Sequence, residues 1–395
     1  MRTTIRRTTA VVIIVHGLVH LMGAMKGLGW ADVARLNQPI STPMGVAWLL
    51  TAVLVTAAGA MILVDARGWW MVSALGAATS QALIITSWSD ARAGTVANVV
   101  LVVATVYGVR SRGPGSHRAR FRQLTTRTAT TARSHRAFTT ATVTEDDLAH
   151  LPPPVAAYVR ATGAVGRPHV TGFHANISGR IRSGPDKPWM PWTGEQVNTF
   201  GDEPSRVLYM DATMKGLPTD VLHAYIGPHA TMQVRLASLL PVVDAHGPWM
   251  DQAETVTILN DMCVLAPAAL VDAPITWTAI DDNHAQATLT NAAHTVTGIL
   301  TFNDANELVD FVSDDRLCAS SDGQSFTQQR WSTPVTNYHT FNGRRLAALG
   351  SARWHPDNEP GFDYLEFHTN DITYFETPPA SAARPTVSAT SDNDR

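Results

Sequence analysis

The sequence has few cysteines, few charged residues and none of the common catalytic motifs. Two cysteines in 395 residues exclude a disulfide-stapled scaffold, and no CxxC or Cys/His cluster offers a metal site. The phosphate-binding loop, GxGxxG, the GxSxG elbow and HExxH are absent. Charged residues make up only 16% of the chain, whereas about a quarter is usual in soluble proteins. The composition therefore excludes a simple soluble domain.

The charges are also unevenly distributed along the chain. The net charge is −3, which argues against a nucleic-acid-binding surface along the whole chain. Residues 1–109 contain four uncharged apolar runs, residues 110–136 contain eight arginines and no acidic residue, and most acids follow Asp146. This asymmetry predicts a membrane part, a basic segment and a soluble part.

The four apolar runs predict a four-helix transmembrane region over residues 1–110. They cover residues 8–25, 44–64, 68–89 and 93–109. About 20 apolar residues in a helix cross the hydrocarbon core of a bilayer. Three arginines precede the first run, as in a signal peptide, but the run is too long for one and contains His16 and His20.

The basic residues beside these runs predict the orientation of the chain in the membrane. Three arginines precede the first run and eight follow the fourth, whereas the intervening outer loops contain Lys26, Arg35 and Arg92. The positive-inside rule then places both termini in the cytoplasm. Two cysteines without a disulfide framework fit that reducing compartment. We expect a multi-pass protein of the inner (plasma) membrane with a cytoplasmic soluble domain.

Two segments have a composition typical of disorder. Residues 111–143 are rich in Arg, Ser, Thr, Ala and Gly, and residues 378–395 are rich in Pro, Ala, Ser and Thr. The arginines would lie along anionic headgroups, each contributing about 1 kcal/mol, or would form a solvated flank of the last helix. We expect a disordered basic linker and a disordered tail on either side of a soluble domain at 144–377.

Alternating apolar and polar residues dominate the soluble domain. About ten such runs, separated by turn residues such as Gly-Pro at 227–228 and Asn-Gly at 342–343, predict an antiparallel meander. One long helical pattern, Met250–Ala266, interrupts them. Because a sheet of this size must bury one face, we expect an all-β or α+β fold. Its curved, half-barrel-like antiparallel sheet would pack against this one long helix.

Several strings in both parts resemble an uncharacterised family of bacterial membrane proteins. They are HGLVHLMGAMKGLGW and WSDARAGTVANVV in the membrane part, and LPPPVAAYVRATGAVG, ETVTILNDMCVLAPAALVD and EFHTNDITYF in the soluble part. The resemblance covers nearly the whole chain except linker and tail. It implies a four-helix membrane region and a soluble domain of unknown function, with no assigned reaction. By looser analogy, the soluble fold is similar to the curved-sheet lipoprotein carriers that hold acyl chains.

The helical run in the soluble domain contains the main candidate site residues. Glu254 and Asp261 are one heptad apart on one stripe, and we expect Arg316 to be their cationic partner. A structural ion pair or a solvated face is the alternative, and seven helical residues, about 10 Å, are a loose spacing for paired acid–base catalysis. The arginines available as partners are Arg235, Arg316 and Arg330.

A cysteine and two tryptophans complete the candidate ligand-binding residues. Cys263 lies on the neighbouring stripe of the helix, without a Cys–His signature, so a small apolar role is the alternative. Trp189 and Trp192 flank prolines in PWMPW, which predicts a rigid aromatic loop. This loop would cap a cavity, dip into lipid or pack on the sheet.

His16 and His20 are a second candidate site, at membrane depth. They are four residues apart, so they project from one face of the first helix, and polar groups inside a membrane are functional candidates by default. Two histidines on one helix cannot both be axial ligands of one haem. The alternatives are a quinone, haem or metal site, or hydrogen bonds to Ser73, Ser80, Gln81 or Asn98.

The leading hypothesis is a membrane-tethered module that holds a hydrophobic ligand, a lipid or isoprenoid, in its curved sheet. One alternative is an enzyme that acts on a membrane-derived substrate through Glu254, Asp261 and Arg316. Another is a quinone- or haem-linked redox protein that uses His16 and His20. The expected partners are membrane lipids and a hydrophobic small molecule, with no nucleic acid. No motif calls for a cofactor or a metal, and no pattern specifies an oligomeric state.

Overall fold

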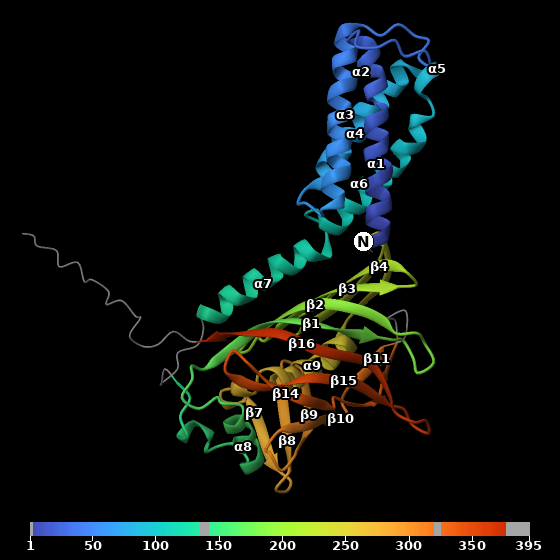
Figure 1. The fold of residues 1–395 in the computed structure, drawn as a ribbon. Helices are drawn as coiled ribbons and strands as arrows, with labels where there is room; N and C mark the ends of the chain where they lie inside the picture. Colours follow the sequence, from blue (N-terminus) through green and yellow to red (C-terminus); the bar gives the residue numbers. More distant parts are fainter. Residues whose placement is uncertain (1–2, 135–141, 320–324, 377–395) are drawn as a thin grey trace, which may run out of the picture. The chain divides into compact units, whose positions relative to one another are not determined.

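The computed structural model describes residues 3–134, 142–319 and 325–376 (Figure 1). The chain forms two compact units. The first comprises residues 1–120 together with 213–220 and 235–241, and the second comprises the remainder of the chain. The predicted disordered tail lies outside the described residues.

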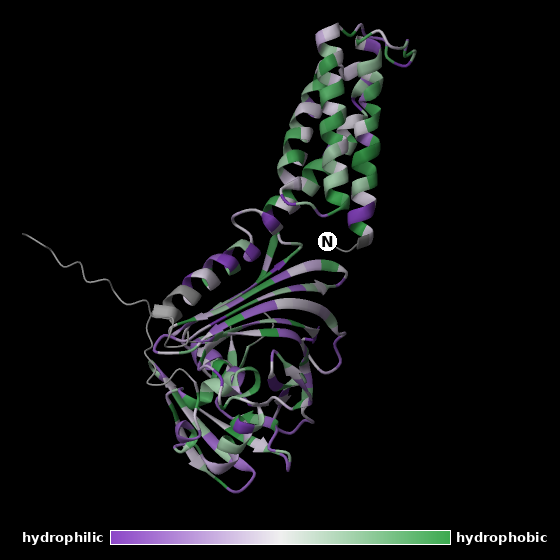
Figure 2. Cartoon of the chain, turned by 60° about the vertical axis from the view of Figure 1, so that its left-hand side comes forward, coloured by the Kyte–Doolittle hydropathy of each residue, from purple (hydrophilic) through white to green (hydrophobic). Residues whose placement is uncertain are grey.

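The first unit is a bundle of apolar helices, drawn mostly as hydrophobic in Figure 2. Helix α1 packs on α3, α3 on α4, and α4 on α6. Glycines allow these close approaches, since a Cβ on Gly17 would lie 2.4 Å from Oγ1 of Thr56 on the facing helix. The helices are α1 (Thr3–Val19), α2 (Leu21–Gly27), α3 (Thr42–Leu63), α4 (Trp69–Thr86), α5 (Trp88–Ala91) and α6 (Gly94–Arg112).

Three helical stretches of the described chain are long and apolar enough to cross a membrane, where the sequence predicted four. They are Thr4–Gly27, Thr42–Leu63 and Gly94–Thr128. The remaining predicted span is present as α4, an uncharged helix of 18 residues whose apolar sequence is interrupted by Ser73, Ser80 and Gln81. Large apolar side chains such as Val53 and Val103 are exposed on the outside of the bundle, as expected for a lipid-facing surface.

The segment predicted as a disordered basic linker contains a helix, α7 (His117–Ser134), so this prediction was wrong over those residues. Phe121 of α7 is 4% exposed and belongs to an apolar cluster with Val207, Tyr209 and Leu222 of the sheet. Its neighbour on the same face, Leu124, packs against this cluster. Phe121 and Leu124, three residues apart, thus attach one face of α7 to the folded sheet.

The second unit is dominated by a curved antiparallel sheet, which confirms the predicted fold class. The described residues form a sheet of 14 strands in the order β6-β5-β4-β3-β2-β1-β16-β15-β13-β10-β9-β8-β7, with β14 beside β15. Strands β1 to β6 are therefore successive neighbours, and β16 pairs with β1 to join the two halves. The first eight strands are β1 (Val170–Ile181), β2 (Met190–Thr199), β3 (Ser205–Met214), β4 (Leu217–Ile226), β5 (His229–Leu236), β6 (Leu240–His246), β7 (Ile275–Ala279) and β8 (His284–Asn291). The others are β9 (His294–Phe302), β10 (Leu308–Ser313), β11 (Leu317–Ala319), β12 (Phe326–Gln328), β13 (Arg330–Ser332), β14 (Val335–Phe341), β15 (Arg344–His355) and β16 (Phe362–Glu376).

All ten alternating runs lie in strands, and the structure adds strands that the sequence pattern did not reveal. The start of strand β2, which contains Pro191, was predicted as part of a loop, yet β2 pairs with β1 along its whole length. Trp192 is therefore part of a strand, which corrects the predicted loop at that position. Strands β11, β12 and β13 contain three residues each, too few to show an alternating pattern.

Helix α9 (Pro248–Leu265) lies inside the curve of the sheet and forms the centre of the core (Figure 1). Every residue from Ala253 to Leu265 is buried. The helix contacts β8, β9, β10 and β15 from one half of the sheet and forms side-chain hydrogen bonds with β2, β3 and β4 from the other half. The small residues Ala285 and Ala287 of β8 are buried in the same core. Helix α8 (Pro153–Ala161) packs near its end, where the hydroxyl of Tyr158 donates to the carbonyl of Cys263 at 2.8 Å.

Candidate functional site

A cluster of buried charged and amide side chains lies between α9 and strands β2, β3 and β4. Helix α9 contributes Glu254 and Asp261, and both are buried. The strands contribute four polar side chains on the face that contacts the helix. These are Gln196 and Asn198 of β2, Arg206 of β3 and His223 of β4, all less than 10% exposed.

Strand alternation explains why these polar side chains point inward. Gln196 and Asn198 are two residues apart and therefore share one face of β2. Arg206 has the same phase as Leu208 and Met210, which belong to the main apolar core. The sheet register places Asn198 directly opposite Arg206. The cluster is therefore a polar interruption of an otherwise apolar inner face.

Asp261 is bound by three donors through one oxygen. Its Oδ2 accepts hydrogen bonds from Nε2 of Gln196 at 2.7 Å, Nδ2 of Asn198 at 2.9 Å and Nε of Arg206 at 2.8 Å. Hydrogen bonds to an ionised group are stronger than those between neutral groups. These three contacts hold the carboxylate against strands β2 and β3.

Glu254 is completely buried and lies among cationic groups. Its Oε1 accepts a hydrogen bond from Nη1 of Arg316 at 3.1 Å, and its Oε2 lies 3.4 Å from Nη1 of Arg206 and 3.2 Å from Nε2 of His223. Burial by itself raises the pKa of Glu254, but the charges of His223, Arg316 and Arg206 outweigh burial and hold the pKa below its ordinary value. The group is therefore an ionised, buried carboxylate.

The structure corrects the predicted pairing of the arginines. Arg316 contacts Glu254, as the sequence suggested, but the cationic partner of Asp261 in the described chain is Arg206. The guanidinium of Arg316 also lies 5.3 Å from the ring centroid of Trp331, within cation–π range. Arg206 was not among the predicted partners. An arginine in phase with the inward leucine and methionine of a strand was the signal that could have revealed it.

Several buried polar atoms of helix α9 and of the cluster have no hydrogen-bond partner among the described residues. They are Nε of Arg316, Oδ1 of Asn260 and Nε2 of His223, whose 3.2 Å contact with Glu254 lacks hydrogen-bond geometry. Native interiors leave few such atoms unpaired, so each one calls for an explanation. The unpaired nitrogen atoms of Arg316 and His223 thus remain available beside the two ion pairs.

Cys263 and the two tryptophans do not join this cluster as ligands. Cys263 is fully buried, and burial raises the pKa of its thiol, so it remains a neutral core residue. Trp192 is 5% exposed and packs in the main core. Trp189 precedes β2 and lies between the guanidinium groups of Arg180 and Arg182, at 4.6 and 4.4 Å from its ring. Trp189 therefore has cation–π partners at the end of β1 and directly after it.

His16 and His20 form a hydrogen-bonded network inside the helical bundle. Nε2 of His16 lies 2.9 Å from Oδ1 of Asn98, and Nε2 of His20 lies 2.9 Å from Oγ of Ser80. Nδ2 of Asn98 donates in turn to Oε1 of Gln81 at 2.9 Å. These partners were among those considered from the sequence. Nε2 of both rings is thus already hydrogen-bonded. Coordination of a metal ion or a haem iron through these nitrogen atoms is therefore disfavoured.

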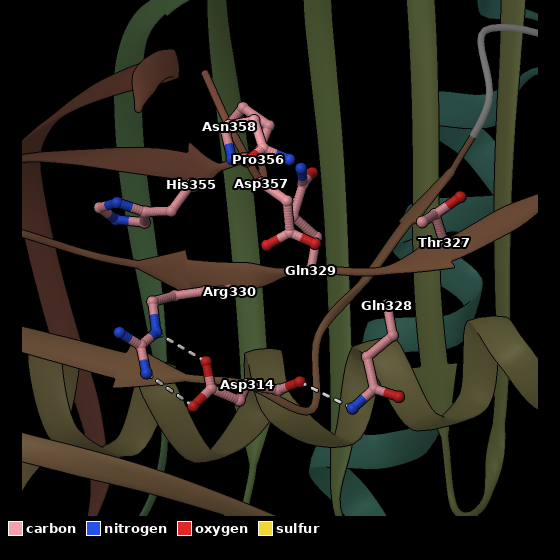
Figure 3. A pocket seen from close by; sticks show the side chains of 9 residues that line it. All are labelled: Asp314, Thr327, Gln328, Gln329, Arg330, His355, Pro356, Asp357 and Asn358. Atoms are coloured by element: carbon pink, nitrogen blue, oxygen red, sulfur yellow. Dashed lines mark hydrogen bonds and ion pairs between the residues drawn. The ribbon is translucent and has the colours of Figure 1, made fainter. Parts of the chain in front are cut away.

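An open polar pocket of about 760 Å³ lies elsewhere on the sheet unit (Figure 3). It is lined by polar residues that include Asp314, Arg330, His355 and Asp357. Arg330 and Asp314 form a two-pronged ion pair at 2.7 and 2.9 Å, which Figure 3 shows across the pocket wall. The charges of this pair compensate each other. The pocket was not predicted from the sequence, because its residues come from separate segments with no shared motif.

A family model described as a family of unknown function (DUF6544) matches residues 141–367, more than half of the chain. The chain belongs to this family. The predicted membership in an uncharacterised family is thereby confirmed. The family description names no activity, and no curated protein matches the sequence.

Solved structures with low similarity to the chain have also been found. One is a DUF1329 family protein from Desulfovibrio piger, 10% identical, with a TM-score of 0.33 over 56% of this chain and 91% of that one. A putative outer membrane lipoprotein-sorting protein domain from Vibrio parahaemolyticus is 10% identical, with a TM-score of 0.31 over 51% and 85%. A LolA superfamily protein from Nitrosomonas europaea is 11% identical, with a TM-score of 0.32 over 57% and 94%.

Proposed function

We propose that this protein is a membrane-anchored module that binds an amphiphilic, lipid-like molecule between α9 and strands β2 to β4. The observation that carries this proposal is the buried charged cluster on the inner face of the curved sheet. The bound molecule would place its apolar part beside Leu208 and Met210 and its polar head at Arg206 and Arg316. Both parts of the site lie on one inward face, because Arg206, Leu208 and Met210 alternate along β3.

The cluster is poorly suited to a purely structural role. Removing two carboxylates and two guanidinium groups from water costs several kcal/mol per ion, and well-packed apolar residues are often as stabilising. On its other side, α9 meets the apolar strands β8, β9 and β10. Charged groups regain hydration when they separate, whereas apolar groups do not. Rehydration of the charged groups would therefore offset part of the cost of opening the β2–β4 side.

The unpaired polar atoms indicate the chemistry of the ligand's head. The Nε of Arg316 is a buried donor without a partner, and it lies on the same guanidinium that contacts Glu254. A phosphate, carboxylate or hydroxyl oxygen would satisfy this donor. A hydrocarbon tail next to such an acceptor is typical of membrane lipids and of isoprenoid phosphates.

An enzymatic role of the same residues has less support. A general acid needs a carboxyl group that is protonated near the working pH, whereas the cationic neighbours of Glu254 hold its pKa low. Asp261 already accepts three hydrogen bonds through Oδ2. Both carboxylates therefore fit the orientation of arginines better than proton transfer.

The apolar helices associate the N-terminal part with a membrane, and we propose that this is the bacterial inner membrane with the sheet unit in the cytoplasm. The excess of arginines before the first and after the last apolar helix supports this orientation. Reporter fusions placed after Arg136 test it. Activity of a cytoplasmic reporter is expected there, and activity of a reporter that works only in the periplasm would contradict the orientation.

Photo-crosslinking tests the ligand proposal on the full-length chain. The protein is reconstituted in nanodiscs that contain a phospholipid with a diazirine in its acyl chain, irradiated, and mapped by peptide mass spectrometry. We expect adducts on the inward residues Leu208 or Met210. Adducts confined to the helices before residue 113, with none on β3, would overturn the proposal.

Two variants separate specific binding from background labelling. Arg316→Met removes the proposed partner of the polar head and should lower labelling of β3. Arg330→Met is the matched control, because Arg330 is an exposed arginine in an ion pair with Asp314 outside the cluster. Equal labelling in Arg316→Met and the unmodified protein would exclude a role of Arg316 in head-group binding.

A further inference from the structure

Two hairpin ends of the sheet belong to the same compact unit as the apolar helices. Residues 213–220 comprise the turn between β3 and β4 with the adjoining ends of both strands, and residues 235–241 comprise the same part of the β5–β6 hairpin. Nη1 of Arg235 contacts the carbonyl of Gly115, in the loop that follows α6, at 3.4 Å. The two turns are also connected to each other, since the amide of Ala237 donates to the carbonyl of Pro218 at 2.6 Å.

These hairpin ends are located at the polar end of the helical bundle. Asp65, in the turn between α3 and α4, lies 2.7 Å from Arg112 at the end of α6 and 3.5 Å from Arg6 near the start of α1. The loop that contacts Arg235 begins directly after Arg112. A ring of charged residues at the end of apolar helices marks the level of lipid headgroups.

Each hairpin end exposes a large apolar side chain. Leu217 is 42% exposed and Leu240 is 61% exposed. Exposed leucines on hairpins at the edge of a sheet favour contact with another apolar surface. The apolar surface closest to the ends of membrane helices is the boundary between headgroups and acyl chains.

Several basic residues belong to the same unit as these leucines. Lys215 is exposed in the β3–β4 turn. Arg110, Arg120 and Arg235 lie close enough for their charges to act on His117, which is buried in the same unit. Clusters of basic residues next to a membrane helix attract anionic lipids. The unit therefore combines exposed apolar and basic groups beyond the ends of its helices, as do segments that lie in the membrane interface.

We propose that the two hairpin ends, defined as residues 213–220 and 235–241, dock into the membrane interface and bind anionic phospholipid headgroups. The leucines enter the acyl boundary, and Lys215, Arg120 and Arg235 contact lipid phosphates. This inference rests on the part of the proposed function that places the apolar helices across a bilayer. It does not depend on the ligand proposed for the cluster at α9.

Site-specific fluorescence quenching tests this docking with the full-length chain in nanodiscs. Bimane is attached to Leu240→Cys or Leu217→Cys in a Cys318→Ser background, because Cys318 is half-buried while Cys263 is buried. The probe phospholipids carry a nitroxide in the upper acyl chain, in either phosphatidylcholine alone or a mixture with phosphatidylglycerol. We expect blue-shifted emission and loss of fluorescence at both hairpin positions, stronger with phosphatidylglycerol.

Two further positions make each outcome decisive. Ile280→Cys, at an exposed isoleucine after β7, is the matched control and should not be quenched. Val53→Cys, on the exposed side of α3, should be quenched in both lipid mixtures. If Val53→Cys is quenched and Leu240→Cys behaves like Ile280→Cys, the docking proposal is wrong while the membrane anchor stands. If Val53→Cys is not quenched, the proposed anchor fails and the docking fails with it.

Charge substitutions test the choice of lipid. Lys215→Gln combined with Arg120→Gln should reduce the extra quenching that phosphatidylglycerol causes at Leu240→Cys. The protein that retains Lys215 and Arg120 is the reference. If its fluorescence at Leu240→Cys is quenched equally in both lipid mixtures, binding of anionic headgroups is contradicted.

Discussion

Arg206 and Asp261 form an ion pair in the interior of the protein, with Nε of Arg206 2.8 Å from Oδ2 of Asp261. Both side chains are 9% exposed. The same guanidinium reaches Glu254 at 3.4 Å. One arginine of the sheet thus connects both carboxylates of α9.

The first prediction concerns the stability of this pair. Asp261→Asn or Arg206→Met leaves a buried charge without its partner, so each should lower the free energy of unfolding by about 3–5 kcal/mol. The double variant should lose less than the sum, because coupled partners are not additive. Denaturant unfolding followed by tryptophan fluorescence measures all three variants.

A surface pair provides the control for this measurement. Arg330 and Asp314 are 58% and 61% exposed, so Arg330→Met and Asp314→Asn should each cost at most about 1 kcal/mol. Losses of similar size in the buried and exposed pairs would show that the cluster at α9 is hydrated.

The second prediction concerns the acid sensitivity of Glu254. Its pKa in the folded chain is lower than its ordinary value of 4.5. The stabilisation that ionised Glu254 contributes to the fold is therefore complete above pH 4.5. It is lost as the pH falls from there toward the pKa of Glu254 in the folded chain. Glu254→Gln should be less stable than the unmodified protein at pH 7, and the difference should shrink in acid. A constant difference between pH 7 and pH 3 would contradict this assignment.

The third prediction concerns Asp310, which makes stability change with pH in the opposite direction to Glu254. Burial raises the pKa of Asp310, on β10, from 3.8 to about 6. Since the unfolded chain releases this proton at lower pH, stability falls as the pH rises from 3.8 to about 6. Asp310→Asn should therefore melt at a higher temperature than the unmodified protein at pH 8. Below pH 3.8 the two should melt together, and an equal shift at both pH values would contradict the raised pKa.

The fourth prediction concerns the attachment of α7. Phe121→Ala removes the buried aromatic ring that packs on Val207 and Tyr209, a change that typically costs about 3–5 kcal/mol in a core. Trypsin should then cleave after Arg122 and Arg127 faster than in the unmodified protein. The exposed neighbour Gln123→Ala is the control and should leave the cleavage rate unchanged.

The main elements of the fold were predictable because burial leaves a periodic pattern in the sequence. All ten alternating runs are strands, and the pattern at 250–266 is helix α9. Strand β2 was missed because Pro191 is a poor strand residue, and α7 was missed because only Phe121 and Leu124 anchor it. Local composition does not show that a partner surface exists.

The site was predictable only in part, for a related physical reason. Glu254 and Asp261 share a helical stripe, which three- and four-residue spacing reveals. Their partner Arg206 comes from a strand far away in the sequence, and its selection depends on the order of strands in the sheet. That order arises from long-range pairing, which single-sequence patterns do not encode.

The pairing of β1 with β16 has a consequence for biosynthesis. Val170, at the start of β1, pairs with Glu376, at the end of β16. During translation the strands from β1 to β6 emerge first and pair with their sequence neighbours, but β1 keeps an open edge until the last strand leaves the ribosome. A chain of such long-range topology folds slowly and exposes unpaired edges on the way. A nascent chain that stalls before residue 362 lacks β16 entirely, so it would present this edge of β1 to chaperones or to other copies of itself.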